Sequence, residues 1–200
     1  MKYLKELHGI KKLEYLWNYY RFVLYIAACI LMAAIVLCTM FHNKRQITLF
    51  SIVVADADRQ QTDEYKHLEE DLLKVFGTNK KNEKILIDTA ATSNEDDEAT
   101  MNLTMKLSIV EENDILICNE KTYERFHEQN AFADWSEILG EQTEKFDSVI
   151  EEDKLVLSAC TRWEKGNYVQ YNPVYACVLN SSKKKEKAKL FAEYFFESNN

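Results

Sequence analysis

The apolar positions divide the chain into a short head, one long apolar segment and a longer mixed segment. Phe22–Phe41 reads FVLYIAACILMAAIVLCTMF, twenty positions without a charge, glycine or proline. At ~1.5 Å per residue, a helix of this length spans ~30 Å, the thickness of the hydrocarbon core of a bilayer. A core helix of a soluble domain would keep a polar stripe, and a cleaved signal peptide would have a shorter apolar region and a small-residue cleavage site. The pattern therefore predicts a transmembrane helix over 22–41.

The charges beside this segment predict its orientation. Residues 1–21 carry five lysine or arginine side chains and two glutamates, whereas Lys44 and Arg45 flank the other end. Because lysine and arginine are enriched on cytoplasmic flanks, we expect a single-pass protein of the cell membrane with a cytoplasmic N-terminus and residues 46–198 outside. Aromatic rings and apolar residues at helical spacing predict that segment 1–21 lies on the inner membrane surface. It is either an anchor alone or also a docking surface for a partner.

Short apolar runs alternate with amphipathic stretches in the segment that follows. Gln46–Ala55, Ile85–Asp88 and Asp114–Cys118 are apolar runs typical of buried strands, and each precedes a pattern typical of a helix. This order predicts a mainly parallel sheet flanked by helices. Lys154–Cys160 and Tyr175–Leu179 are separated by 14 residues, too few for a crossover helix, so we expect an antiparallel strand pair at the C-terminal end. The predicted fold class is α/β, in one extracytoplasmic domain.

Several residues mark where the predicted helices begin and end. Thr62 and Asn119 have the side chains of N-caps, and Gly77 follows the last apolar position of the first amphipathic helix. The last helix is predicted to begin at Ser181 or Ser182, with a lysine-rich solvated side.

Charge and motifs narrow the classes of function. The segment after Phe41 holds 20 basic and 31 acidic residues, a net charge of −11 within a chain of net charge −8. An acidic surface argues against nucleic acid and against anionic lipid head groups as partners of this domain. The chain has no P-loop, GxGxxG or HExxH motif and no nucleophile elbow. We therefore expect no catalytic residue, no cofactor and no metal, with His67 and His127 as surface residues.

Three cysteines follow the apolar segment, each within an apolar run. Cys118, Cys160 and Cys177 form no CxxC pair and no zinc-like spacing with histidine. One interpretation is that all three are buried, unpaired thiols. The other is a disulfide between Cys160 and Cys177, whose predicted strands are neighbours.

Polar side chains cluster after the predicted parallel strands. Asp56 and Asp58 follow the first strand, Asp88 and the turn at 89–92 follow the second, and Asn119 and Glu120 follow the third. Ligands of open parallel sheets bind beyond the carboxyl ends of the strands. These side chains are therefore candidate ligand-binding residues for a cation or an amine. The alternative is that they cap helices and solvate loops.

The segment 114–139, DILICNEKTYERFHEQNAFADWSEIL, resembles part of the extracellular solute-binding proteins of the type 2 periplasmic-binding fold. In that family a strand and a helix precede a G-x-apolar-x-D-L sequence; here Asn130 and Ala131 stand where the glycine is expected, and Trp135 replaces the leucine. The 159 residues after Phe41 correspond to little more than one of the family's two lobes, and an apolar span replaces the lipobox cysteine. The layout is similar to that of uncharacterised bacterial membrane proteins with a degenerate, single-lobe domain of this kind. The resemblance implies contact with another protein rather than a solute held between two lobes.

These observations leave three functional hypotheses. The first is a non-enzymatic, membrane-anchored extracytoplasmic module that binds a ligand or a partner protein at the cell envelope. The second is an envelope enzyme or cation-binding protein that uses Asp56, Asp58 or Asp88. The third is a structural anchor, and a solute-binding component of a transporter is a further alternative implied by the resemblance.

Overall fold

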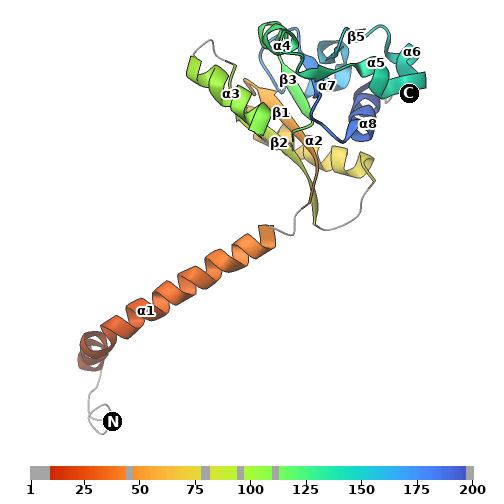
Figure 1. The fold of residues 1–200 in the computed structure, drawn as a ribbon. Helices are drawn as coiled ribbons and strands as arrows, with labels where there is room; N and C mark the ends of the chain where they lie inside the picture. Colours follow the sequence, from red (N-terminus) through yellow and green to blue (C-terminus); the bar gives the residue numbers. More distant parts are fainter. Residues whose placement is uncertain (1–9, 44–46, 78–81, 94–96, 110–112, 197–200) are drawn as a thin grey trace. The chain divides into compact units, whose positions relative to one another are not determined.

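The computed structural model describes residues 10–43, 47–77, 82–93, 97–109 and 113–196 (Figure 1). The chain divides into two compact units, Met1–Gln46 and Ile47–Asn200.

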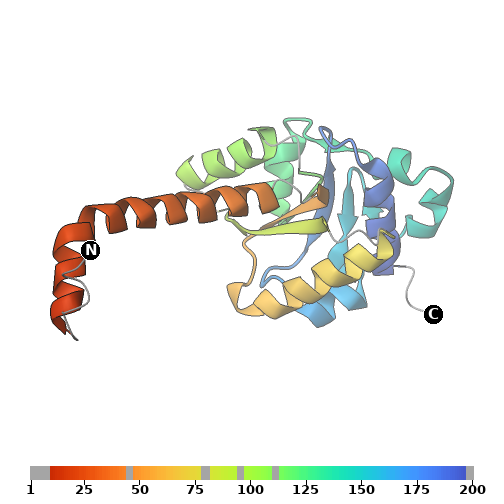
Figure 2. The same cartoon turned by 90° about the horizontal axis from the view of Figure 1, so that it is seen from below.

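The first unit consists of helix α1 (Ile10–Asn43). Within it, Arg21–Phe41 is the one segment among the described residues that is long and apolar enough to cross a membrane. Its described side chains are exposed, so it is not a core helix of the described structure. The beginning of α1 runs in a different direction from the rest of the helix (Figure 2). The predicted helix is thus confirmed as a helix, while residues 1–9 of the predicted head lie outside the described residues.

The second unit is built on a seven-stranded sheet in the order β2-β1-β3-β7-β6-β5, with β4 also paired to β7. The first strand runs parallel to β2 and β3, whereas β7 runs antiparallel to β3, β4 and β6, and β5 runs antiparallel to β6. The strands are β1 (Ile47–Ala55), β2 (Glu83–Ala91), β3 (Ile115–Cys118), β4 (Phe132–Ala133), β5 (Ile150–Glu151), β6 (Lys154–Val156) and β7 (Tyr175–Leu179).

Helices cover both faces of this sheet (Figure 1). The α-helices of the unit are α2 (Thr62–Val75), α3 (Asp97–Ile109), α4 (Glu120–His127), α5 (Trp135–Leu139), α6 (Thr143–Phe146), α7 (Thr161–Gly166) and α8 (Lys185–Phe196). Single 3-10 turns are η2 (Arg59–Gln61), η3 (Gly140–Gln142) and η4 (Leu157–Ala159). The predicted α/β class, with parallel leading strands and an antiparallel β6–β7 pair, is confirmed.

Two core clusters lie on the two faces of the sheet. Because successive side chains of a strand point to opposite faces, Phe50 and Ile52 of β1 belong to one cluster and Val53 to the other. The first core includes buried side chains of α2, α5, α7 and α8, and the second includes those of α3 and α4. The last helix buries Phe191 and Phe195 in the first core.

Some predicted boundaries differ from the structure. Thr62 begins α2 but does not cap it. The chain enters the helix through η2, in which the backbone N–H of Gln60 donates to the side chain of Asp58. The strand predicted over Lys154–Cys160 ends at Val156, and the short helix α7 follows it, where no helix was expected. The last helix begins at Lys185 rather than at Ser181 or Ser182.

Ser182 instead belongs to a buried polar network at the start of β3. The carboxylate of Asp114 accepts hydrogen bonds from the backbone N–H of Ser51 at 2.8 Å, the hydroxyl of Ser182 at 2.6 Å and the ammonium of Lys184 at 3.0 Å. A buried carboxylate is stable only when paired and hydrogen-bonded. Lys184 is therefore tied to the fold, unlike the solvated role predicted for the lysine cluster.

The structure contains no disulfide between Cys160 and Cys177. Both are buried free thiols, Cys160 in the first core and Cys177 in the second, so the sheet lies between them. The Cys160 thiol donates to the carbonyl oxygen of Phe195 at 2.8 Å. Burial, and after it the interaction with the Cys118 side chain, raise the pKa of Cys177. The buried-thiol interpretation therefore describes these residues, and the proposed bridge does not.

Candidate functional site

A cavity of about 520 Å³ lies at the carboxyl ends of the parallel strands. Its walls come from four separate segments: the residues after β1, the end of β2 with the loop behind it, the start of α4 and the loop between α7 and β7. Most of the lining side chains are polar, namely those of Asp56, Asp58, Arg59, Thr89, Thr92, Asn119, Gln170 and Tyr171.

Asp56 fixes the loop that follows β2. Its carboxylate accepts hydrogen bonds from the Thr92 hydroxyl at 3.1 Å, from the Ser93 backbone N–H at 2.9 Å and from the Ser93 hydroxyl. Its own backbone N–H donates to the Ala91 carbonyl at 3.0 Å. Asp56 adopts a φ of 51°, in the left-handed region that aspartate tolerates better than most residues. One residue thus ends β1, turns the chain and holds the neighbouring loop.

Asp58 joins the segment after β1 to the loop before β7. Its Oδ1 accepts from the Gln60 backbone N–H at 2.9 Å, and its Oδ2 accepts from the Gln170 side-chain amide at 3.1 Å. These two donors, the Gln60 N–H first, lower the pKa of the Asp58 carboxyl. Asp58 is therefore an ionised side chain at the cavity wall at neutral pH.

The loop before β7 docks against the segment after β1. Ala57 and Val169 form an antiparallel bridge, and the Asp58 backbone N–H donates to the Tyr168 carbonyl at 2.9 Å. The Tyr171 hydroxyl donates to the Ala55 carbonyl at 3.0 Å. Burial raises the pKa of Tyr171, so its hydroxyl stays protonated and continues to donate. These contacts bring Gln170 and Tyr171 to a cavity whose other walls come from residues 56–119.

Asn119 completes the wall on the side of β3. Its Oδ1 accepts from the Thr122 backbone N–H at 2.9 Å and caps α4, while its Nδ2 lies 3.4 Å from the Ser93 hydroxyl. The predicted N-cap is confirmed, and the same side chain links the loops that follow β2 and β3. The cavity edge is thus one continuous hydrogen-bonded chain from Asp56 through Ser93 to Asn119.

Two of the predicted site residues lie elsewhere. Asp88 is inside β2, which continues to Ala91, and its carboxylate accepts from Lys106 of α3 at 2.6 Å. Glu120 accepts from Lys154 at 3.1 Å and from the Tyr175 hydroxyl. The Tyr175 hydroxyl and then Lys154 lower the pKa of Glu120. Asp56, Asp58 and Asn119 share the cavity, whereas Asp88 and Glu120 do not line it.

The cavity is suited to a polar ligand. Its carboxylates accept donors and its Arg59 side chain offers a cation, so a molecule with both hydrogen-bond donors and acceptors fits the lining. Both aspartates already receive hydrogen bonds from the protein, which leaves them less able to hold a metal. Within the described ranges, no three histidine, cysteine or carboxylate side chains gather in this cavity as metal ligands do.

A comparison with known proteins found no matching family model, no matching curated protein and no matching solved structure. The site is therefore interpreted from its own geometry.

Sequence reasoning missed Arg59, Gln170 and Tyr171 as lining residues. Gln170 and Tyr171 lie more than 110 positions from Asp58 and Ala55, the residues they bind. No local sequence pattern predicts these two contacts. The one available signal is the cluster of polar and aromatic residues in a loop without helical or strand periodicity, which is typical of binding loops.

Proposed function

We propose that the chain is a single-pass membrane protein whose extracytoplasmic α/β domain binds a small polar ligand without chemical conversion. The observation that carries the proposal is the cavity at the carboxyl ends of β1 and β2, lined by polar side chains from four segments. Ligand sites of open α/β sheets form at this edge. The apolar segment Arg21–Phe41 supports anchoring in the membrane, and the basic head supports an N-terminus in the cytoplasm.

The lining favours binding over catalysis. Asp56 and Asp58 are held by protein donors and keep fixed positions, as the walls of a preformed ligand site do. Neither residue has a histidine, cysteine or lysine partner in the lining that would act with it as a nucleophile or a general base. The single-lobe resemblance of residues 114–139 to solute-binding proteins agrees with a binding role and is itself part of the proposal.

The test is thermal unfolding of the full chain in detergent with a panel of amino acids, polyamines, sugars and divalent cations. A ligand at a hundredfold excess over its Kd stabilises a protein by about 2.7 kcal/mol, which shifts the unfolding midpoint measurably. Arg59→Ala should abolish the shift, because Arg59 lines the cavity and its side chain is exposed. Lys165→Ala, an exposed cation on α7 outside the lining, is the matched control and should keep the shift.

Two results would reject the proposal. One is a panel in which no compound moves the midpoint of the wild-type chain. The other is a shift of equal size in wild type, Arg59→Ala and Thr89→Val, which would place the ligand outside the cavity.

Contact with a partner protein at the envelope stays a prediction. Crosslinking of the full chain in intact cells tests it, and a defined crosslinked species that forms only in the presence of the cavity ligand would join the two activities.

A further inference from the structure

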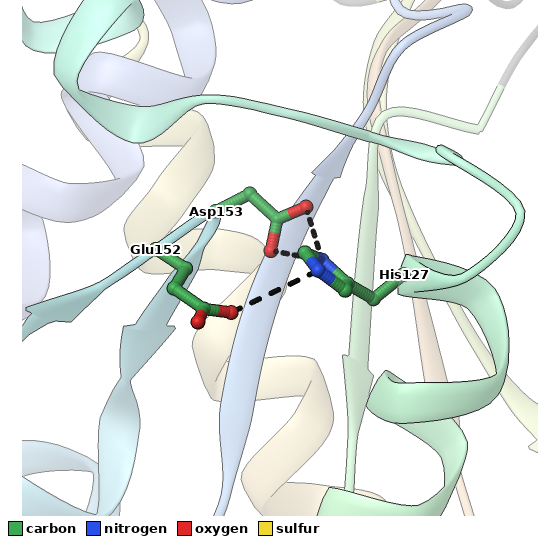
Figure 3. Close-up of side chains that lie close together, drawn as sticks. All are labelled: His127, Glu152 and Asp153. Atoms are coloured by element: carbon green, nitrogen blue, oxygen red, sulfur yellow. Dashed lines mark hydrogen bonds and ion pairs between the residues drawn. The ribbon is translucent and has the colours of Figure 1, made fainter.

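A second cluster of chemically active side chains lies outside the cavity, where α4 meets the turn between β5 and β6 (Figure 3). His127 is the last residue of α4, and Glu152 and Asp153 form the turn. The three point toward one another from these two elements (Figure 3). His127 Nδ1 lies 3.0 Å from Asp153 Oδ2, and His127 Nε2 lies 3.8 Å from Glu152 Oε2.

We propose that His127, Glu152 and Asp153 form a binding site for a divalent transition-metal ion such as Zn²⁺. One ligand atom from each residue lies within 4.8 Å of the other two. Ligand atoms about 2.0–2.2 Å from a tetrahedral zinc ion lie roughly 3.3–3.6 Å from each other. The 3.0 Å between His127 Nδ1 and Asp153 Oδ2 is close to this value. The 3.8 Å contact of Glu152 is with the other ring nitrogen, so the exposed Glu152 carboxylate must move toward Nδ1 to complete the set of three ligands.

The hydrogen-bond inventory of the cluster favours a cation at its centre. The Tyr123 hydroxyl lies 3.1 Å from His127 Nδ1, 2.9 Å from Glu152 Oε2 and 2.6 Å from Asp153 Oδ1. A phenol has one hydrogen, so the Tyr123 hydroxyl can donate to only one of the two carboxylates that it contacts. Acceptors outnumber donors, and a metal ion accepts the lone pairs that have no hydrogen to bind.

The local charge also favours a cation. Four carboxylates and one ammonium lie in this region: Lys154 Nζ lies 3.1 Å from Glu120 Oε1 and 3.6 Å from Glu151 Oε2, while Glu152 and Asp153 face His127. The histidine stands at the C-terminus of α4, the end of a helix that attracts positive charge. The sum of these charges is negative where the three ligand atoms meet.

Exposure sets the kind of metal site. The Asp153 side chain is 16% exposed, whereas those of His127 and Glu152 are 45% and 70% exposed. The partly buried Asp153 carboxylate has a fixed position. The exposed His127 and Glu152 side chains leave room for a water molecule as the fourth ligand. One nitrogen with two carboxylate oxygens suits zinc and similar ions better than magnesium or calcium, which prefer oxygen ligands. The geometry describes an exchangeable site that ties the β5–β6 turn to α4.

The test is titration of the full chain in detergent with Zn²⁺, followed by calorimetry, for wild type and three variants. His127→Ala, Asp153→Asn and Glu152→Gln should each weaken the tightest Zn²⁺ binding by at least about tenfold, since tenfold is lost even when a residue that only orients a ligand is removed. His67→Ala is the matched control, because His67 is exposed on α2 and distant from any such group among the described residues. Its Zn²⁺ affinity should equal that of wild type.

Three results would overturn the proposal. They are equal Zn²⁺ affinity in wild type and in both His127→Ala and Asp153→Asn, equal losses in His67→Ala and His127→Ala, and equal affinity for Zn²⁺ and Mg²⁺. If His127→Ala does not fold, Glu152→Gln decides, because it changes one atom of an exposed turn side chain. The result is independent of the proposed cavity ligand, since none of the three residues lines the cavity.

Discussion

Two acidic regions of the domain differ in how many hydrogen-bond donors the protein supplies. At the cavity, the carboxylates of Asp56 and Asp58 receive five donors from backbone and side-chain groups. At the β5–β6 turn, the carboxylates of Glu152 and Asp153 face one tyrosine hydroxyl and one imidazole. The fold therefore supplies more hydrogen-bond donors to Asp56 and Asp58 than to Glu152 and Asp153.

The difference separates a structural use of carboxylates from a use as ligands. A carboxylate that already accepts two or three protein donors holds loops in place, and its contribution to binding is a fixed wall and a fixed charge. A carboxylate with few donors keeps lone pairs for a proton or a metal ion. Sequence position alone left both uses open, because the aspartates after the first strand were either candidate ligands for a cation or an amine, or residues that cap helices and solvate loops.

The largest expected effect is the loss of Asp56. Asp56→Ala removes three hydrogen bonds and places alanine at a φ of 51°, so we expect destabilisation by about 2 kcal/mol or more. Asp56→Asn keeps an acceptor oxygen and a residue that tolerates this φ, so its loss should be smaller. Urea unfolding of the full chain in detergent, followed by circular dichroism, measures both. Equal midpoints for wild type and Asp56→Ala would remove the structural role assigned to this carboxylate.

A pair of tyrosine variants distinguishes the two regions by their response to zinc. Tyr123→Phe removes one of the donors at the turn and Tyr171→Phe removes the donor to Ala55 at the cavity, each at a cost of about 1 kcal/mol. Without the Tyr123 hydroxyl the two turn carboxylates repel each other more. Zn²⁺ should therefore raise the unfolding midpoint more in Tyr123→Phe than in wild type.

The matched variant sets the baseline for that measurement. In Tyr171→Phe the zinc response should equal that of wild type, because Tyr171 lies at the cavity. A zinc response that changes equally in both variants would mean that the comparison between the two regions is wrong.

The longer elements were predictable because each shows a period. Strand β1 and helices α2 and α8 have nine, 14 and 12 residues, and their apolar patterns identify a buried run or one buried face. Strands β4 and β5 have two residues, and α5, α6 and α7 have four to six. Segments of that length show no period, so only strand pairing or packing on the sheet reveals them.

The residues of the candidate site were predictable where they directly follow a parallel strand. Asp56, Asp58 and Asn119 follow β1 and β3 directly and line the cavity, as the topology of a parallel sheet implies. Asp88 was wrongly placed at a strand end, because β2 continues through polar residues as an edge strand to Ala91. The contacts of Gln170 with Asp58 depend on tertiary docking that no local pattern contains.

The metal cluster was unpredictable for the same reason. His127 ends a helix, and Glu152 and Asp153 form a turn 25 positions later, where the sequence indicates only a polar surface segment. Their meeting depends on the antiparallel order β7-β6-β5 beside β3, which places the turn against α4. Spacing rules for metal motifs apply to ligands that share one helix or one loop, and this cluster draws on two elements.

The smallest expected effect concerns acid pH, and it compares Asp58 at the cavity with Glu120, which pairs with Lys154 next to the β5–β6 turn. The pKa values of Asp58 and Glu120 are lowered from their ordinary values of 3.8 and 4.5. A lowered pKa in the folded state means that the ionised form is stabilised, so the contribution is present above the ordinary pKa and is lost as pH falls through the lowered one. Asp58→Asn and Glu120→Gln should each flatten the acid side of the stability profile, measured as the unfolding midpoint from about pH 6 to about pH 2, which is about two units on either side of these values.

Gln170→Ala tests which donor matters at Asp58. The Gln60 backbone N–H is the larger cause of the lowered pKa and the Gln170 amide the smaller, so this variant should flatten the acid limb less than Asp58→Asn does. The exposed position of Asp58 keeps both effects small. An acid limb that is unchanged in Asp58→Asn but altered in Gln170→Ala would show that Gln170 acts on the loop and not through this carboxylate. Such a result would also weaken the contrast between the two regions. The Asp58 carboxylate would then stabilise its loop no more than Glu152 and Asp153 stabilise the β5–β6 turn.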